Sequence, residues 1–163
     1  MFSFCTQRPE ILIASHFLAK LTQKILYIHH PTNNINYEQF KKNIICTLNQ
    51  YYDDTWNTED PLENNSYRII SFELGVNALI SHSFNITQRF DASIHLAGKY
   101  PPSLKIFINP GEVKISYQSK IYILYKCNTK QILNPIIKNI KKNTFEQYTH
   151  ASTLLDTEQL NQN

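Results

Sequence analysis

The N-terminal third of the chain has the hydrophobic spacing of two amphipathic helices. After Pro9 and Glu10, which suit the first turn of a helix, apolar residues recur at helical spacing: Ile11, Ala14, Leu18, Leu21 and Ile25. This helix is expected to end before His29-His30-Pro31. Asn36 and Gln39 have the spacing of a capping box, and a second apolar stripe follows them: Tyr37, Phe40, Ile44, Leu48 and Tyr51. The pattern predicts a helical hairpin that must pack against another element.

Residues 51–66 lose this periodicity. The segment, YYDDTWNTEDPLENNS, holds five acidic residues, no basic residue and the only tryptophan, Trp56. Beyond it, residues 67–72 predict a strand, and residues 76–84 and 91–96 predict short helices. We therefore expect an irregular loop between the helical hairpin and a region of short elements.

The region after residue 103 alternates in the manner of half-buried strands. The alternating apolar residues are Leu104, Ile106 and Ile108, then Val113, Ile115 and Tyr117, and then the strand Ile121 to Tyr125, with turns at Asn109-Pro110-Gly111 and Gln118-Ser119-Lys120. An antiparallel meander that follows helices indicates an α+β fold, with the N-terminal helical hairpin and short helices packed on a small antiparallel sheet. We assign residues 1–127 to this single domain. Residues 128–163 form a polar C-terminal extension, partly helical over residues 131–142 or flexible.

Composition narrows the function classes. The chain has 163 residues, a length that suits one domain, and it contains neither GxGxxG nor GxxxxGK[ST], which argues against the usual nucleotide-binding folds. The apolar run Ile11 to Ala14 is far short of the roughly 20 residues of a membrane span. Cys5, Cys46 and Cys127 are odd in number and lack CxxC spacing, so we expect reduced thiols and a cytoplasmic or nuclear protein. We predict no cofactor, metal, membrane contact or small-molecule substrate.

The titratable residues form no catalytic set. Carboxylates between residues 53 and 63 could in principle form a metal or acid–base site, but their spacing matches no metal loop, and a solvated acidic loop is the favoured interpretation. These carboxylates belong to Asp53, Asp54, Glu59, Asp60 and Glu63. His29 and His30 suit a helix C-terminus, and His82 and His95 fall in the predicted short helices. We predict that the protein is not an enzyme.

Lysine is concentrated towards the C-terminus. Residues 99–142 contain nine lysines and one acidic residue, Glu112, although the net charge of the chain is only +3. Lys105 and Lys114 fall on the sheet face opposite the apolar residues, and Lys120 lies in the following turn. Two interpretations follow: a weak RNA contact through these lysines, or an ordinary solvated outer face, which the scarcity of arginine favours.

Phe107 is the most informative residue of the predicted sheet. Strand alternation directs it away from the core, and Asn109 leaves on the same side, next to Pro110. An outward aromatic ring beside a rigid polar turn is suited to binding a protein partner. Coverage of the ring by a helix or by the C-terminal extension explains it equally well, and both interpretations stay open.

Several motifs, in the correct order, resemble the BTG/Tob anti-proliferative family over about residues 8–126. The matching segments are residues 52–56 (YDDTW), Pro61, residues 66–70 (SYRII), residues 77–80 (NALI) and residues 101–115 (PPSLKIFINPGEVKI). The first three resemble the first signature box of the family, except that Thr55 replaces a histidine. The last resembles the second box, in which Pro110, Glu112 and Val113 match outright. The chain resembles a divergent member of this family.

The resemblance implies a non-catalytic adaptor that binds a Caf-type deadenylase nuclease, promotes mRNA poly(A) shortening and so controls translation and proliferation. Carried over by position, the partner-binding residues are Asn77, Phe107 and Asn109, with Pro110 and Glu112 beside them. The family has aspartate, tryptophan and aspartate at the first three positions. Phenylalanine keeps an apolar plug without the indole donor, and each asparagine lacks a negative charge, so we expect a weakened or replaced nuclease contact.

Other residues of the resemblance have structural roles. Trp56, Tyr67 and Arg68 belong to the first box, and we expect Trp56 to hold the loop that precedes the first strand, with a surface anchor as the alternative. Leu133-Asn134-Pro135 loosely resembles a peptide with which some Tob-type proteins engage poly(A)-binding protein, but a short helix packing back on the domain is favoured. The alternative function is a basic scaffold subunit of a larger ribonucleoprotein or self-assembling complex, without deadenylase binding.

Overall fold

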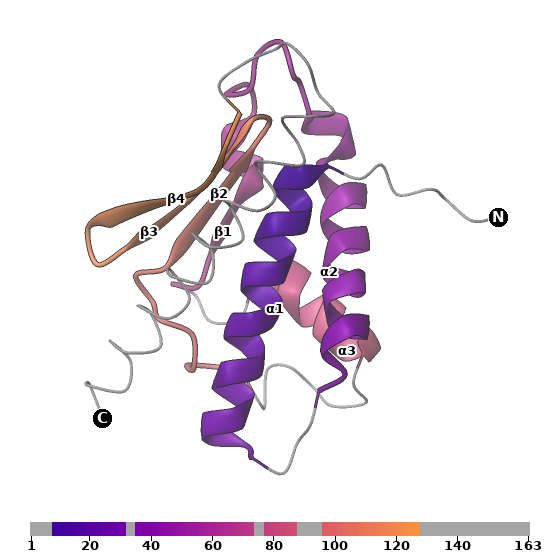
Figure 1. The fold of residues 1–163 in the computed structure, drawn as a ribbon, viewed down its shortest axis with the longest axis vertical. Coiled ribbons are helices and arrows are strands. Elements are labelled where there is room, and N and C mark those ends of the chain that lie inside the picture. Colours follow the sequence, from indigo (N-terminus) through magenta and orange to yellow (C-terminus); the bar gives the residue numbers. More distant parts are fainter. Residues whose placement is uncertain (1–7, 32–34, 74–76, 88–95, 128–163) are drawn as a thin grey trace, which may run out of the picture.

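The computed structural model describes residues 8–31, 35–73, 77–87 and 96–127, which form three helices and a four-stranded antiparallel sheet (Figure 1). The helices are α1 (Pro9–His29), α2 (Tyr37–Tyr52) and α3 (Ala78–Thr87). The strands are β1 (Ile69–Ser71), β2 (Lys105–Asn109), β3 (Glu112–Tyr117) and β4 (Lys120–Lys126). Two short 3-10 helices, η1 (Asp53–Thr55) and η2 (Asn65–Arg68), lie between α2 and β1. The predicted α+β fold is confirmed.

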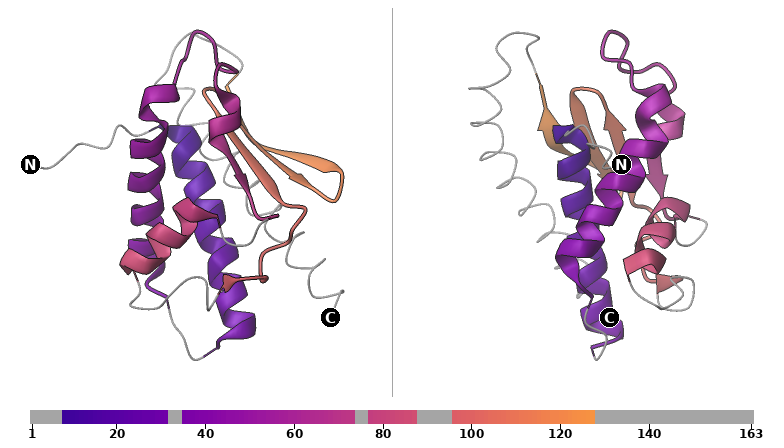
Figure 2. Two further views of the ribbon diagram at one scale, coloured as in Figure 1. Left: turned by 180° about the vertical axis from the view of Figure 1, so that it is seen from behind. Right: turned by 90° about the vertical axis from the view of Figure 1, so that its right-hand side faces the viewer.

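α1 is the central helix of the fold. It packs against β2, β3 and β4 on one side and against α2 on the other, and α3 packs on α2 (Figure 2). Because apolar layers lie on both sides of α1, its buried residues extend beyond the predicted stripe to Phe17, Ala19 and Leu26. A helix that is apolar around most of its circumference belongs in the interior of a protein.

The same property makes α1 resemble a membrane span. By length and composition alone, Pro9–His29 is long and apolar enough to cross a membrane. The uninterrupted apolar run Ile11 to Ala14 did not indicate this, because the hydropathy of the whole helix decides it. The core helix of a soluble protein and a signal sequence near an N-terminus pass the same test, and 56% of the apolar window is buried in this fold. The packing of α1 between the sheet and α2 accounts for its apolar character.

α2 begins with half of the predicted capping box. The Asn36 Oδ1 atom accepts a hydrogen bond from the Gln39 backbone N–H at 3.1 Å. The Gln39 side chain does not return to Asn36 but donates to Asn43 Oδ1 at 3.1 Å, one turn further along the helix. The apolar stripe of α2 then buries Phe40, Ile44 and Leu48 against α1 and α3.

The sheet has the strand order β1-β2-β3-β4, and all neighbouring strands are antiparallel. Its inner face supplies buried side chains to the core, and α1 packs on β2, β3 and β4. These side chains are Ile70, Ile106, Ile108, Val113, Ile115 and Leu124. Gln118 and Ser119 form the β3–β4 turn with φ values of 49° and 63°. The meander predicted from strand alternation is therefore present, with β1 added at its far edge.

The predicted boundaries differ from the structure where side chains redirect the backbone. The strand predicted over residues 67–72 is a 3-10 helix up to Arg68 followed by the three-residue β1, because Arg68 turns inward and is fully buried. The helix predicted over residues 76–84 is α3, Ala78–Thr87. The helix predicted over residues 91–96 lies outside the described residues except for Leu96, and so do Cys5, His95 and residues 128–163. The domain boundary at residue 127 stays a prediction.

Glu10 fastens the start of α1 to the β2–β3 turn. Its side chain is buried, and Oε1 accepts a hydrogen bond from the Gly111 N–H at 2.8 Å. Gly111 has φ +83°, a conformation that glycine adopts without strain. Burial raises the pKa of Glu10 above its ordinary value of 4.5, although the Gly111 hydrogen bond and Arg8 oppose this shift.

We expect Glu10→Gln to stabilise the protein at neutral pH, because glutamine keeps an acceptor for Gly111 and removes the buried charge. Since the folded-state pKa of Glu10 lies above the unfolded value, the wild type is most stable below the unfolded pKa and loses stability as pH rises through the folded pKa. Chemical denaturation from pH 4 to pH 8 should therefore show a gap between variant and wild type that grows with pH. Glu10→Ala is the contrasting variant: it also removes the charge but leaves the Gly111 N–H without its acceptor, so it should be about 1–3 kcal/mol less stable than Glu10→Gln at every pH. A Gln variant as unstable as the Ala variant contradicts this role.

Candidate functional site

The outer face of the sheet points away from the helices (Figure 1). The strand register pairs Ile69 with Phe107, Phe107 with Lys114, and Lys114 with Ile123. Paired positions share a face, so these four side chains form one row across all four strands. The Lys114 Nζ atom lies 5.3 Å from the Phe107 ring centroid and 3.7 Å from Glu112 Oε1. Phe107 is half-buried on this outward face, the direction that strand alternation predicts.

Asn109 ends β2 on the same face but is not exposed to solvent. Its side chain is only 5% exposed, and Oδ1 accepts a hydrogen bond from Arg68 Nη2 at 3.1 Å. Asn109 therefore lies on the same side of the sheet as Phe107, as strand alternation predicts, but its contact with Arg68 keeps it buried. Pro110 is also buried, and Glu112 is half-buried. Participation of Asn109 in partner binding stays a prediction, with any effect passing first through Arg68.

Arg68 is the polar centre of this region. Its side chain is fully buried, and Nη2 donates to the carbonyl oxygens of Pro61 and Glu63, both at 2.9 Å. Nη1 donates to the Thr55 carbonyl, and Nε donates to the Ile108 carbonyl at 3.2 Å. With Asn109, all of these acceptors are neutral oxygen atoms. One guanidinium thus ties three points of the loop after α2 to the end of β2.

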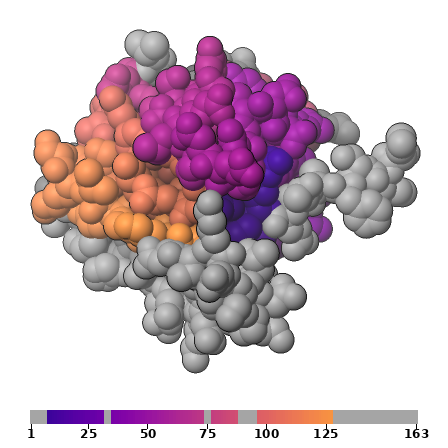
Figure 3. All heavy atoms as spheres, turned by 90° about the horizontal axis from the view of Figure 1, so that it is seen from above, coloured from indigo at the N-terminus to yellow at the C-terminus, as the bar shows by residue number. Residues whose placement is uncertain are grey.

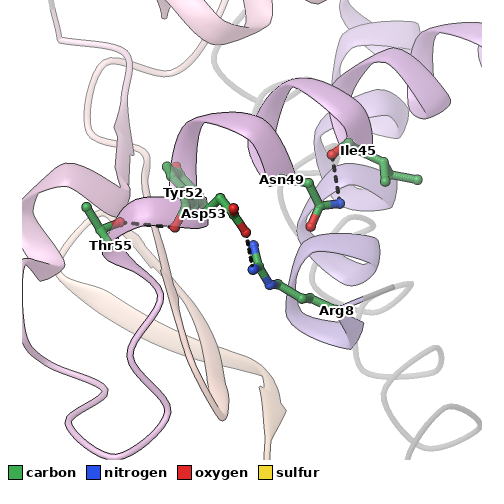
Figure 4. Close-up of polar contacts among 6 residues, drawn as sticks. All are labelled: Arg8, Ile45, Asn49, Tyr52, Asp53 and Thr55. Atoms are coloured by element: carbon green, nitrogen blue, oxygen red, sulfur yellow. Dashed lines mark hydrogen bonds and ion pairs between the residues drawn. The ribbon is translucent and has the colours of Figure 1, made fainter. Parts of the chain in front are cut away.

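Trp56 lies under two cations. The guanidinium carbons of Arg8 and Arg68 are 5.0 Å and 5.9 Å from its ring, and Arg8 Nη2 also pairs with Asp53 Oδ1 at 2.7 Å (Figure 4). Thr55 closes the turn by donating to the Tyr52 carbonyl at 3.3 Å. These contacts suit the structural role expected of Trp56 and give the acidic loop a fixed path, over the upper end of the molecule beside the sheet (Figure 3).

The fixed loop presents two apolar side chains that lack a core to bury them. Tyr67 and Leu62 are both exposed, although they flank the buried Arg68 and the Pro61 carbonyl that it binds. Sequence reasoning assigned Tyr67 a structural role and did not single out Leu62. The only sequence signal for their exposure is that each stands within a run of acidic and amide residues. The same pattern fits a buried residue, so it does not predict exposure.

Asn77 is placed on a different element. Its Oδ1 atom accepts a hydrogen bond from the Leu79 N–H at 2.9 Å, and its carbonyl accepts one from Ser81 at 2.9 Å, so it caps the start of α3. α3 packs on α2, and among the described residues these hydrogen bonds stay within the helix and reach neither Phe107 nor Asn109. The proposed partner residues are therefore not one hydrogen-bonded cluster.

The other candidate groups are engaged in local ion pairs. Lys105 Nζ pairs with Glu73 Oε1 at 3.0 Å, and Lys114 pairs with Glu112. Of the three lysines predicted to contact RNA, Lys120 is the one that is exposed. In the part of the chain that the structure describes, no group of three or more histidine, cysteine, aspartate or glutamate residues could hold a metal ion. The outer sheet face with its adjoining loop is the candidate surface that the described residues define best.

This combination of fold and surface is that of a protein-interaction domain. Residues 7–127 match the family model described as "BTG family", and the chain belongs to that family. The family is non-catalytic, and membership supports a BTG-like adaptor role for this protein.

A solved structure shares the fold. The BTG/Tob domain of C. elegans FOG-3, solved with two substitutions, superposes with a TM-score of 0.52 at 16% sequence identity. The match covers 69% of this chain and 88% of that domain. No curated protein matches the chain by sequence.

We expect Asn109→Asp to stabilise the fold by about 1 kcal/mol, because the introduced carboxylate would give the buried Arg68 a charged partner in place of a neutral one. The gain should be present above the unfolded carboxyl pKa of about 4 and disappear as pH falls through the lower folded value. Thermal or urea unfolding at pH 7 and pH 3 measures both effects. Asn65→Asp, which adds the same charge at an exposed position, is the matched control and should change stability little. Destabilisation by Asn109→Asp at pH 7 would show that Arg68 needs no counter-charge.

Proposed function

We propose that this protein is a non-catalytic adaptor that binds a Caf-type deadenylase nuclease through Phe107 on the outer sheet face, and so promotes mRNA poly(A) shortening and restrains translation and proliferation. The proposal rests on membership of the BTG family and on one observation: the aromatic side chain at the family's tryptophan position faces outward on β2. We further propose that it acts in the cytoplasm, the nucleus or both.

The surroundings of Phe107 have the composition of a binding hot spot. An aromatic ring lies at the centre, the apolar Ile69 lies beside it in the register, and the charged Lys114 and Glu112 lie on its other side. Tyr67 and Leu62 add two exposed side chains on the loop whose carbonyl groups Arg68 binds. Apolar centres with polar rims are typical of protein interfaces, in which a few aromatic residues supply most of the affinity.

The three positions at which this chain departs from the family pattern affect three different contacts. Phe107 retains the apolar contact but has no indole N–H to donate to a partner. Asn109 is buried against Arg68. The negative charge that an aspartate would carry at this position would therefore face Arg68 and not the surface of a partner. Asn77 still caps α3, a role that asparagine and aspartate fill about equally well. Affinity for the nuclease should therefore depend mainly on Phe107.

Replacing Phe107 tests the proposal most directly. Phe107→Ala should weaken binding to a purified Caf-type nuclease by about 30-fold, because truncating an aromatic hot spot costs about 2 kcal/mol. Phe107→Trp should bind at least as tightly as the wild type, because it adds the indole donor. Isothermal titration calorimetry with folded variants gives these affinities.

Tyr27→Ala provides the matched control, because Tyr27 is an exposed aromatic residue in the last turn of α1, away from the outer sheet face. Its affinity should equal that of the wild type. Equal binding by the wild type and Phe107→Ala, or no binding by the wild type, rejects the nuclease-adaptor proposal and leaves the BTG fold unaffected.

A further inference from the structure

β4 is an open edge of the sheet. Six of its seven residues pair with β3 on one side, the ladder passing over Leu124 at a register shift, and no strand among the described residues pairs with the other side (Figure 1). β1, at the opposite edge, has only three residues. A strand edge presents unpaired backbone N–H and C=O groups, which an extended peptide can satisfy by adding a strand. β4 is long enough for this mode of binding, and β1 is not.

The side chains of β4 favour such an addition. Ile121 is 67% exposed and Ile123 is 47% exposed, while Leu124 is buried in the core. Ile121 and Ile123 pair with Ser116 and Lys114 of β3, so both lie on the outer sheet face. Alternate apolar side chains along an open edge offer an added strand cross-strand partners as well as backbone hydrogen bonds. Neither isoleucine belongs to the hydrophobic core or to the partly buried side chains packed against it.

Positive charge lies at both ends of the same strand. Lys120 and Lys126 are exposed, and neither forms an ion pair among the described residues. Lys105 and Lys114, by contrast, are neutralised by Glu73 and Glu112. The lysines of the sheet that form no ion pair among the described residues therefore lie at the two ends of β4.

From these observations we infer that the β4 edge is a docking site for an extended segment of a partner protein, with alternating apolar residues flanked by acidic ones. The segment adds a fifth strand to the sheet: its backbone pairs with β4, its apolar side chains pack on Ile121 and Ile123, and its acidic ends face Lys120 and Lys126. The site is distinct from the nuclease contact proposed at Phe107, because it uses the strand edge rather than the centre of the face.

The charges also argue against a second copy of this chain as the occupant. A second copy of β4 carries the same two exposed lysines and no acidic residue, so it offers neither lysine an opposite charge. Lysine on edge strands is a common device against self-association, and the same charges attract an acidic segment.

A synthetic peptide of alternating valine and threonine, flanked at each end by two glutamates, tests the inference with the intact protein. Fluorescence anisotropy should show saturable binding that weakens with added salt, because exposed ion pairs are screened. The same peptide flanked by lysines should bind about tenfold more weakly or not at all. A glutamate-flanked peptide with N-methyl groups along one backbone edge should lose binding, because it cannot complete the strand ladder.

Two protein variants locate the site. Ile121→Ser combined with Ile123→Ser should reduce peptide affinity about fivefold, while Ile86→Ser, at an isoleucine 57% exposed on α3, should leave it unchanged. Phe107→Ala should also leave peptide binding unchanged, which separates this result from the outcome of the nuclease test. Circular dichroism confirms that each variant is folded.

Three results would overturn the inference: no binding of the glutamate-flanked peptide, equal binding of the lysine-flanked or N-methylated peptide, and equal loss of binding in Ile86→Ser. Concentration-dependent dimerisation in sedimentation experiments, abolished by the paired serine substitutions, would assign the β4 edge to a second copy and also overturn it.

Discussion

The buried guanidinium of Arg68 is the interaction on which the upper end of the molecule depends. It donates to three carbonyl groups of the loop after α2 and to two oxygen atoms at the end of β2. Unpaired, each of the two buried acceptors at the end of β2 would cost about 1–3 kcal/mol. The acidic loop has little hydrophobic core of its own, so its path is fixed by these bonds and by Trp56 packing under Arg68 and Arg8. The shape of the surface beside Phe107 therefore depends on this one side chain.

This arrangement changes how a substitution at Asn109 is interpreted. On the sequence, asparagine in place of aspartate removes a charge from a partner-facing turn. In the structure, the same change removes the counter-charge of a buried cation, because Asn109 Oδ1 is bonded to Arg68. A substitution at Asn109 would first affect the loop that carries Tyr67 and Leu62. It would affect a bound partner only through that loop. A residue can therefore matter for binding without touching the bound protein.

Local spacing predicted the helical hairpin, the meander and the outward direction of Phe107, since these depend on helical and strand periodicity alone. The polar contacts that shape the site could not be predicted in this way. Arg68 and Asn109 are 41 residues apart, and Glu10 and Gly111 are 101 apart, so no local pattern connects them. The exposure of Tyr67 was missed for the same reason: the inward turn of its neighbour Arg68 decides it.

The small net charge of the chain conceals two oppositely charged neighbourhoods on one sheet. An acidic loop, held by Arg68, borders the Phe107 end of the outer face, and unneutralised lysines border β4. Complementary charge steers and selects partners more than it strengthens binding, so each neighbourhood favours a partner of the opposite sign. Lys114 lies between them, in the same cross-strand row as Phe107 and Ile123. Because its ammonium group contacts both Phe107 and Glu112, Lys114 lies at the boundary where the two differently charged surfaces meet.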